Sequence, residues 1–156
     1  MTKLQDRNDA QAIETVYAHY CTVIDSKDFT GLREVFLPDA VQDYRSSNGI
    51  LEFGVEPLIT RLTRNMGHGS LCGETAHSVS NIRIKVDGDT ARAKARFHAT
   101  HHGLEHFVGK RYACWGEYSD DWVRTDDGWR ITRRHYRNTR TEGPVEIIRG
   151  RPAPAS

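Results

Sequence analysis

The sequence predicts an α+β fold, in which three N-terminal helices cover the concave face of a long, bent antiparallel sheet and so form a cone. Two patterns support this prediction. Apolar residues recur at helical spacing before about residue 66, and after Gly73 they alternate with a period of two. The length of 156 residues suits a single domain, expected over residues 1–149, with room for a core and one ligand cavity. Residues 150–156 are predicted to be a disordered tail.

The first helix is predicted from about Asp9 to Asp25, with Asp9 as its N-cap. Its apolar positions, which fall on one face, are Ile13, Val16, Tyr17, Tyr20, Val23 and Ile24. A short second helix is expected around residues 32–37, where Pro38 would stop it. A third helix is expected over residues 55–66, followed by a glycine-rich break.

Strands are predicted where apolar and polar residues alternate. The expected strands are residues 41–44, 78–86, 90–100, 111–124 and 129–140. Turns rich in Gly, Asp, Asn and Ser are expected at 46–49, 87–89 and 125–128. Because sequential strands joined by tight turns pair in opposite directions, these elements indicate an antiparallel sheet.

The run from Thr90 to Thr100 alternates most regularly. Its inward face carries mostly alanines, which leave volume for a ligand cavity, and its outward face carries charged side chains. His101 continues the inward face, whereas His98 and His102 continue the outward one, so this histidine cluster is not predicted to bind a metal. His77 has the wrong parity to face inward, so either the strand carries a β-bulge over residues 78–81 or His77 is exposed. The bulge is favoured, because Ser and Asn tolerate one.

Composition excludes several classes of function. The net charge of +1, with basic and acidic residues interleaved, gives no basic stripe for nucleic acid. No apolar run is long enough to cross a membrane, and the start of the chain lacks a signal-peptide pattern, so a cytoplasmic protein is expected. Three cysteines without a CxxC pair are read as reduced thiols. No metal or cofactor is expected.

Four side chains stand out as a set for proton transfer: Asp25, Tyr44, His77 and His101. Each also has a purely structural interpretation. Asp25 can bond the backbone at a helix end, and His77 can be a structural histidine. Tyr44 can be a half-buried strand residue. His101 can cap the strand end in solvent, although the alternation argues against this. Tyr118 and Tyr136 are predicted to contact substrate from the later strands. The basic run at residues 133–137 is read as a solvated or subunit-facing strand, with an anion clamp as the alternative.

Several short segments carry a family resemblance. They are Asp25-Ser26-Lys27-Asp28, Leu32-Arg33, Asp43-Tyr44-Arg45-Ser46, Thr75-x-His77, His101 and Asp127-Gly128-Trp129. On these segments the chain resembles the nuclear transport factor 2-like superfamily, in its SnoaL-like branch, and within that branch it is similar to the scytalone dehydratases.

The resemblance implies that Asp25 orients His77, that His77 moves the substrate proton, and that Tyr44 and His101 bind a water, carbonyl or leaving oxygen. The chain departs from the dehydratase pattern at Ile24, where a tyrosine is expected, and near Gly116 and Tyr118, where serine and asparagine are expected.

The predicted function is a cofactor-independent lyase that removes water or another β-leaving group from a small cyclic, aromatic or polyketide-type substrate. The same dyad would also suit a retro-aldol-type carbon–carbon lyase, a dehydrohalogenase or an isomerase. A non-catalytic ligand-binding module, or one like a dioxygenase small subunit, is the alternative of another class. Self-association as a trimer or dimer is expected, because both faces of strands 111–140 carry aromatic residues. One face is predicted to carry Ala113, Trp115 and Trp129. The other is predicted to carry Tyr112, Cys114, Tyr118, Trp122 and Tyr136.

Overall fold

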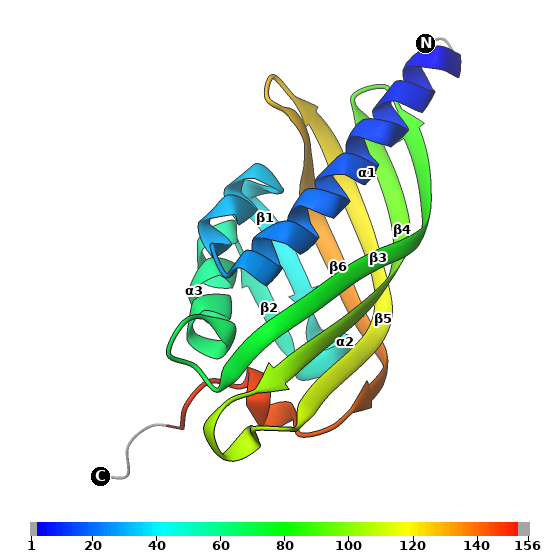
Figure 1. Ribbon diagram of the computed structural model, residues 1–156. Coiled ribbons are helices and arrows are strands. Elements are labelled where there is room, and N and C mark those ends of the chain that lie inside the picture. The colour runs from blue at the N-terminus through cyan, green and yellow to red at the C-terminus, as the bar shows by residue number, and fades with distance from the viewer. Residues whose placement is uncertain (1–2, 153–156) are drawn as a thin grey trace.

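The computed structural model describes residues 3–152 and contains helices packed on one curved sheet (Figure 1). The helices are α1 (Lys3–Ser26), α2 (Arg45–Asn48) and α3 (Val55–Met66), with short 3-10 helices η1 (Phe29–Glu34), η2 (Glu105–Phe107) and η3 (Val145–Ile148). The strands are β1 (Phe36–Tyr44), β2 (Ile50–Phe53), β3 (Cys72–Asp87), β4 (Thr90–Gly103), β5 (Arg111–Thr125) and β6 (Gly128–Glu142). The predicted α+β fold is confirmed.

The six strands lie in the order β2-β1-β6-β5-β4-β3. Every neighbouring pair is antiparallel except β1 and β6, which run parallel, so the prediction of a wholly antiparallel sheet is wrong at this pair. Figure 1 shows α1 crossing the concave face of the sheet and α3 standing beside β1 and β2. Strand β1 precedes the meander of β3 to β6 in the chain. It pairs with β6, the last strand of that meander. No helix within residues 3–152 is both long enough and apolar enough to span a membrane.

The alternation predicted for β4 is confirmed. Its alanines, Phe97 and His101 are buried, while the intervening side chains reach the surface. The bulge predicted in β3 is also present: the β3–β4 register shifts between Ser80 and Arg83, and Asn81 adopts a φ of 51°. Before this shift, His77 lies on the same face as His101. After it, the even-numbered residues, including Ile84, face inward. The extra residue therefore turns His77 toward the interior.

The early elements differ from their predicted bounds. The second helix is the 3-10 turn η1, and β1 begins at Phe36 and runs through Pro38. Proline is tolerated there because the β1–β6 register is interrupted between Phe36 and Val41, so no ladder bond needs the missing N–H. The expected turn at 46–49 is the helix α2, ended by Gly49 with a φ of 78°. The edge strand β2 was not predicted, since four residues carry too little alternation.

Asp9 does not cap α1, which already includes Lys3. Instead it is buried, with oxygens 2.7 and 2.8 Å from the Arg124 guanidinium, and it accepts a hydrogen bond of 3.2 Å from the Trp129 indole. The Arg124 bonds outweigh burial and lower the pKa of Asp9 to about 2. Trp129 is therefore held under α1, in the core, and the prediction that it shares a face with the half-exposed Trp115 is wrong.

The basic run of β6 is solvated at Arg133 and Arg137 but not at Arg134. Arg134 is fully buried, and it donates hydrogen bonds of 3.0 and 2.8 Å to Asp120. Its guanidinium also lies 3.8 Å from the centroid of the Tyr118 ring. Arg133 and Arg137 remain partly exposed in ion pairs with Asp43 and Glu117. The alternation of β6 places Arg134 inward, where a buried carboxylate compensates its charge.

The three cysteines are free thiols; Cys72 and Cys114 are buried and Cys21 is half-buried. At the end of the chain, η3 packs against α3 and β5. Arg151 donates a hydrogen bond of 2.8 Å to the Gly69 carbonyl and pairs with Glu105. The start of the predicted tail is thus attached to the domain, and the rest of it, residues 153–156, lies outside the described residues.

Candidate active site

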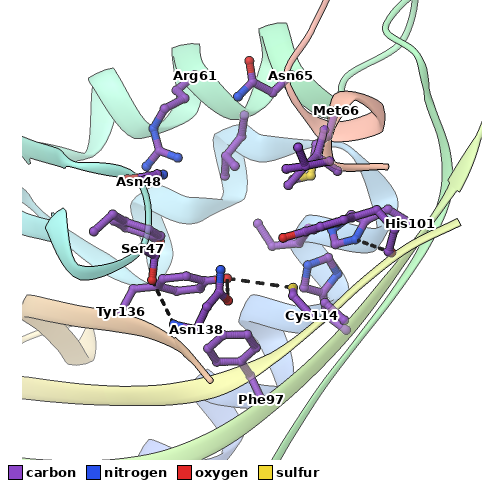
Figure 2. Close-up of a pocket in the computed structure, with 18 of the residues that line it drawn as sticks. Ser47, Asn48, Arg61, Asn65, Met66, Phe97, His101, Cys114, Tyr136 and Asn138 are labelled. Atoms are coloured by element: carbon purple, nitrogen blue, oxygen red, sulfur yellow. Dashed lines mark hydrogen bonds between the residues drawn. The ribbon is translucent and has the colours of Figure 1, made fainter. Parts of the chain in front are cut away.

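A cavity of about 440 Å³ lies between α3, η3 and the inward face of the sheet (Figure 2). This volume falls in the usual range for small-molecule sites, about 300–1,000 Å³. Of the predicted site residues, five line the cavity: Tyr44, His77, His101, Tyr118 and Tyr136. The sixth, Asp25, lies directly behind His77. The structure therefore brings the predicted residues together, although their roles stay predictions.

Asp25, near the end of α1, holds His77 from behind. Its carboxylate lies 2.8 Å from His77 Nδ1, accepts a 3.0 Å hydrogen bond from the His77 backbone amide, and accepts a 2.7 Å bond from the Thr75 hydroxyl. With Nδ1–H donating to the carboxylate, the other ring nitrogen, Nε2, carries the lone pair. The bulge in β3 makes this possible, because it turns both Thr75 and His77 toward α1.

Asp25 stays ionised although it is partly buried. Burial favours the neutral acid, but the hydrogen bonds from His77 and Thr75 outweigh burial and hold the pKa of Asp25 below its usual value. The side chain of Asp25 is 31% exposed and that of His77 is 10% exposed. A carboxylate that stays ionised beside an imidazole can stabilise the imidazolium formed when that imidazole accepts a proton.

His101 lies next to His77, with the two ring centroids 5.2 Å apart and the rings nearly perpendicular. It is 3% exposed, and its Nδ1 lies 3.2 Å from the Tyr112 carbonyl oxygen, to which it donates (Figure 2). Burial, together with the nearby His77, lowers the pKa of His101 to about 3. His101 is therefore neutral near pH 7, and its Nε2 is a hydrogen-bond acceptor rather than a cation.

Aromatic rings form one wall of the cavity. Phe97 stacks on both Tyr118 and Tyr136 at centroid distances of 4.7 Å, and Tyr136 stacks on Tyr44 at 4.5 Å. The Tyr136 hydroxyl donates a 2.8 Å hydrogen bond to the Asn138 side chain (Figure 2). Burial raises the pKa of both Tyr118 and Tyr136 far above the usual value. Both phenols therefore keep their protons. Tyr118 can act as a hydrogen-bond donor toward a ligand, whereas Tyr136 already donates its proton to Asn138.

Tyr20 is a cavity residue that sequence reasoning missed. It lines the cavity one helical turn before Ile24, the position at which the dehydratase pattern expects a tyrosine. Its ring meets that of Tyr118 edge to face, with centroids 5.9 Å apart. The spacing of four residues, which places both side chains on one helix face, was the available signal. The sequence reading had assigned this face wholly to the core.

The rest of the cavity lining includes several polar side chains. These side chains, none of which was predicted, are Ser47, Asn48, Arg61, Asn65 and Asn138, together with Arg64 and Arg149. Figure 2 shows Arg61 and Asn65 extending from α3. Arg61 is paired with Glu52 at 2.9 Å and lies over the Tyr44 ring at 4.7 Å. The site thus combines an imidazole oriented by a carboxylate, neutral donors and acceptors, and polar side chains.

An imidazole held by a carboxylate, with hydroxyl donors nearby, suits chemistry that moves a proton away from an acidic carbon. Within the described part of the chain, no three His, Cys, Asp or Glu side chains converge as a metal site would require. The free thiol of Cys114 also faces the cavity, but burial raises its pKa to about 11, which makes it a poor nucleophile.

Comparison with known proteins places the chain in a protein family. The model of the SnoaL-like domain matches residues 5–135. The uncharacterised protein Rv2910c of Mycobacterium tuberculosis is 36% identical over 138 residues, which is 86% of this chain and 88% of that protein.

Two solved structures share the fold at low sequence identity. A candidate scytalone dehydratase from Novosphingobium aromaticivorans has a TM-score of 0.81 at 23% identity, covering 99% of each chain. The type 3 hexachlorocyclohexane dehydrochlorinase of Novosphingobium barchaimii has a TM-score of 0.75 at 15% identity, covering 92% of this chain and 95% of that one. Because the family model spans most of the chain, the chain belongs to the SnoaL-like domain family.

Proposed function

We propose that this protein is a cofactor-independent lyase that uses His77 as a base, oriented by Asp25, on a small cyclic or aromatic substrate. The observation that carries the proposal is the 2.8 Å contact between His77 Nδ1 and the Asp25 carboxylate, at the wall of the cavity. A module that only binds a ligand has no need for a histidine whose tautomer is fixed by an ionised acid.

In the proposed reaction, His77 Nε2 takes a proton from a carbon next to a carbonyl group or an aromatic ring. The electrons of that carbon–hydrogen bond form a carbon–carbon double bond, and the leaving group departs from the adjacent carbon with its bonding pair. When the leaving group is hydroxide, the proton on His77 passes to it, directly or through the Tyr44 hydroxyl. Water then leaves, and the imidazole returns to its neutral form.

The surroundings of the dyad support this sequence of steps. His101 is neutral and contributes an acceptor nitrogen, so it does not repel the imidazolium that forms on His77. Tyr118 holds its proton and can donate to a substrate oxygen as its negative charge grows. The aromatic wall around Phe97 suits a flat, cyclic substrate body.

The proposal can be tested before the natural substrate is known. 2-Tetralone has acidic C–H bonds beside both a carbonyl group and an aromatic ring but no leaving group, so only proton abstraction can occur. Its hydrogen–deuterium exchange in heavy water, followed by proton NMR, should be faster with the protein than without it. His77→Gln should remove the acceleration, whereas His98→Gln, on the outward face and stacked on Trp115, should keep it.

A binding module would give no acceleration with either the original protein or its variants. Acceleration that survives His77→Gln would show that another group is the base. Once a cyclic ketone exchanges, derivatives with a hydroxyl or a halogen on the adjacent carbon extend the test to elimination, since the new conjugated double bond changes the ultraviolet absorbance.

A further inference from the structure

The rim of the cavity contains two arginines without an acidic partner. Arg64 and Arg149 both line the cavity, yet neither forms an ion pair with a carboxylate within residues 3–152. Arg61, from the same helix as Arg64, is by contrast matched to Glu52. The cavity therefore carries an uncompensated positive charge at one end.

These two arginines come from segments that touch. Gly150 packs so closely on α3 that a Cβ added there would lie 3.1 Å from the Arg64 carbonyl oxygen and 3.2 Å from the Asn65 side-chain oxygen. Arg64 also donates a 3.0 Å hydrogen bond to that Asn65 oxygen, which anchors its guanidinium near the rim. The end of the chain thus places Arg149 beside the last turn of α3.

The positive end lies close to the proposed base. Arg149 is near enough to the Tyr112 hydroxyl for its charge to oppose the burial that raises the pKa of that phenol to about 12. Tyr112 in turn contacts His101, with ring centroids 5.6 Å apart, and His101 contacts His77. An anionic group held by Arg149 would therefore be only a few side chains away from the reacting carbon.

We propose that the natural ligand of this cavity is a cyclic or aromatic acid, whose carboxylate is bound by Arg64 and Arg149 while its ring lies against the aromatic wall. The guanidinium group offers paired N–H donors that fit the two oxygens of a carboxylate. Asn65, which contacts both Arg64 and the Gly150 segment, provides a neutral donor beside them. This inference names the substrate class for the proposed function and rests on it only for the position of the reacting carbon.

The test compares two probes of the same shape, 2-naphthoate and 2-naphthamide, by isothermal titration calorimetry. The original protein should bind the carboxylate about tenfold more tightly than the amide, as expected for charge-assisted hydrogen bonds at a partly exposed rim. The double variant Arg64→Gln/Arg149→Gln should lose this preference. The control Arg92→Gln/Lys94→Gln, which removes two charges from the outward face of β4, should keep it. Added salt should reduce the preference, because the rim is exposed.

Equal affinity for the two probes, a preference that survives in the double glutamine variant, or no binding of naphthoate at millimolar concentration would each overturn the inference. His77→Ala separates it from the proposed function. This variant should keep the preference for the carboxylate even though it cannot abstract a proton. If the original protein prefers the carboxylate but does not accelerate exchange, the proposed base is wrong and the arginine site stands. If it accelerates exchange but shows no preference for the carboxylate, the arginine site is wrong and the proposed base stands.

Discussion

Replacing Asp25 with asparagine is the sharpest test of the dyad. The change keeps the size of the side chain but removes the charge that faces the His77 ring at 2.8 Å. It also leaves one oxygen to accept the three hydrogen bonds that now arrive from the His77 ring, the His77 amide and the Thr75 hydroxyl. We therefore expect a loss of proton-abstraction rate with the fold retained.

The size of the loss follows from the geometry. Unit charges 2.8 Å apart attract by about 6 kcal/mol at an effective dielectric constant of about 20. Because the Asp25 side chain is 31% exposed, solvent screens part of this attraction, and we take about half, or about 3 kcal/mol. This attraction exists only once His77 gains its proton, so it stabilises the transition state and not the ground state. Its loss in the asparagine variant should lower the rate about a hundredfold.

The assay is the hydrogen–deuterium exchange of 2-tetralone, with a thermal melting curve for each variant. Thr75→Val is the matched control, because it removes one hydrogen bond to Asp25 and leaves the carboxylate in place. It should cost about 1 kcal/mol, or about fivefold in rate. An Asp25→Asn protein that melts like the original and keeps more than a third of its rate would refute the role of the dyad.

Three further predictions concern stability and assembly. The pKa of His101 is about 3 in the folded protein and 6.5 in the unfolded chain, so the unfolded state gains a proton first as pH falls below 6.5. Urea unfolding should show about 2 kcal/mol less stability at pH 5 than at pH 7 from this group, and His101→Gln should remove that part of the slope. Arg134→Met should cost about 3–5 kcal/mol by leaving Asp120 buried without its cation, and adding Asp120→Leu should recover much of it; an unchanged urea midpoint for the single variant would contradict this. The protein should also form a trimer or dimer through the outward face around Trp115, and a monomer mass by light scattering at micromolar concentration would reject this.

The sequence alone determined which side chains share a face where the alternation is regular, as in β4. The strict alternation of β4 placed the alanines and His101 inside, and the structure confirms it because the side-chain period of a strand does not depend on its neighbours. The wrong parity of His77 likewise predicted the bulge at Ser80–Asn81, since an inward His77 requires one extra residue. The resemblance then paired His77 with Asp25, and the structure places the two in contact.

Local patterns failed where a residue's environment is set by a distant element. Asp9 looks like a helix cap until Arg124, 115 residues later, is brought against it. Arg134 looks like part of a solvated basic run until β6 turns it toward Asp120. A charged side chain is buried only where its counter-charge is also buried, and that pairing depends on how strands pack.

The rim of the cavity was decided by the tertiary structure in the same way. Nothing near Arg64 or Arg149 in the sequence marks a binding site, and Tyr20 reads as an ordinary core residue of α1. Their common position follows from the curvature of the sheet and from the return of η3 to the end of α3. The sequence determined the two faces of β4 and, by resemblance, predicted the pairing of Asp25 with His77. The packing of those elements determined which side chains meet in the cavity, because contacts between segments far apart in the chain depend on three-dimensional arrangement and not on local periodicity.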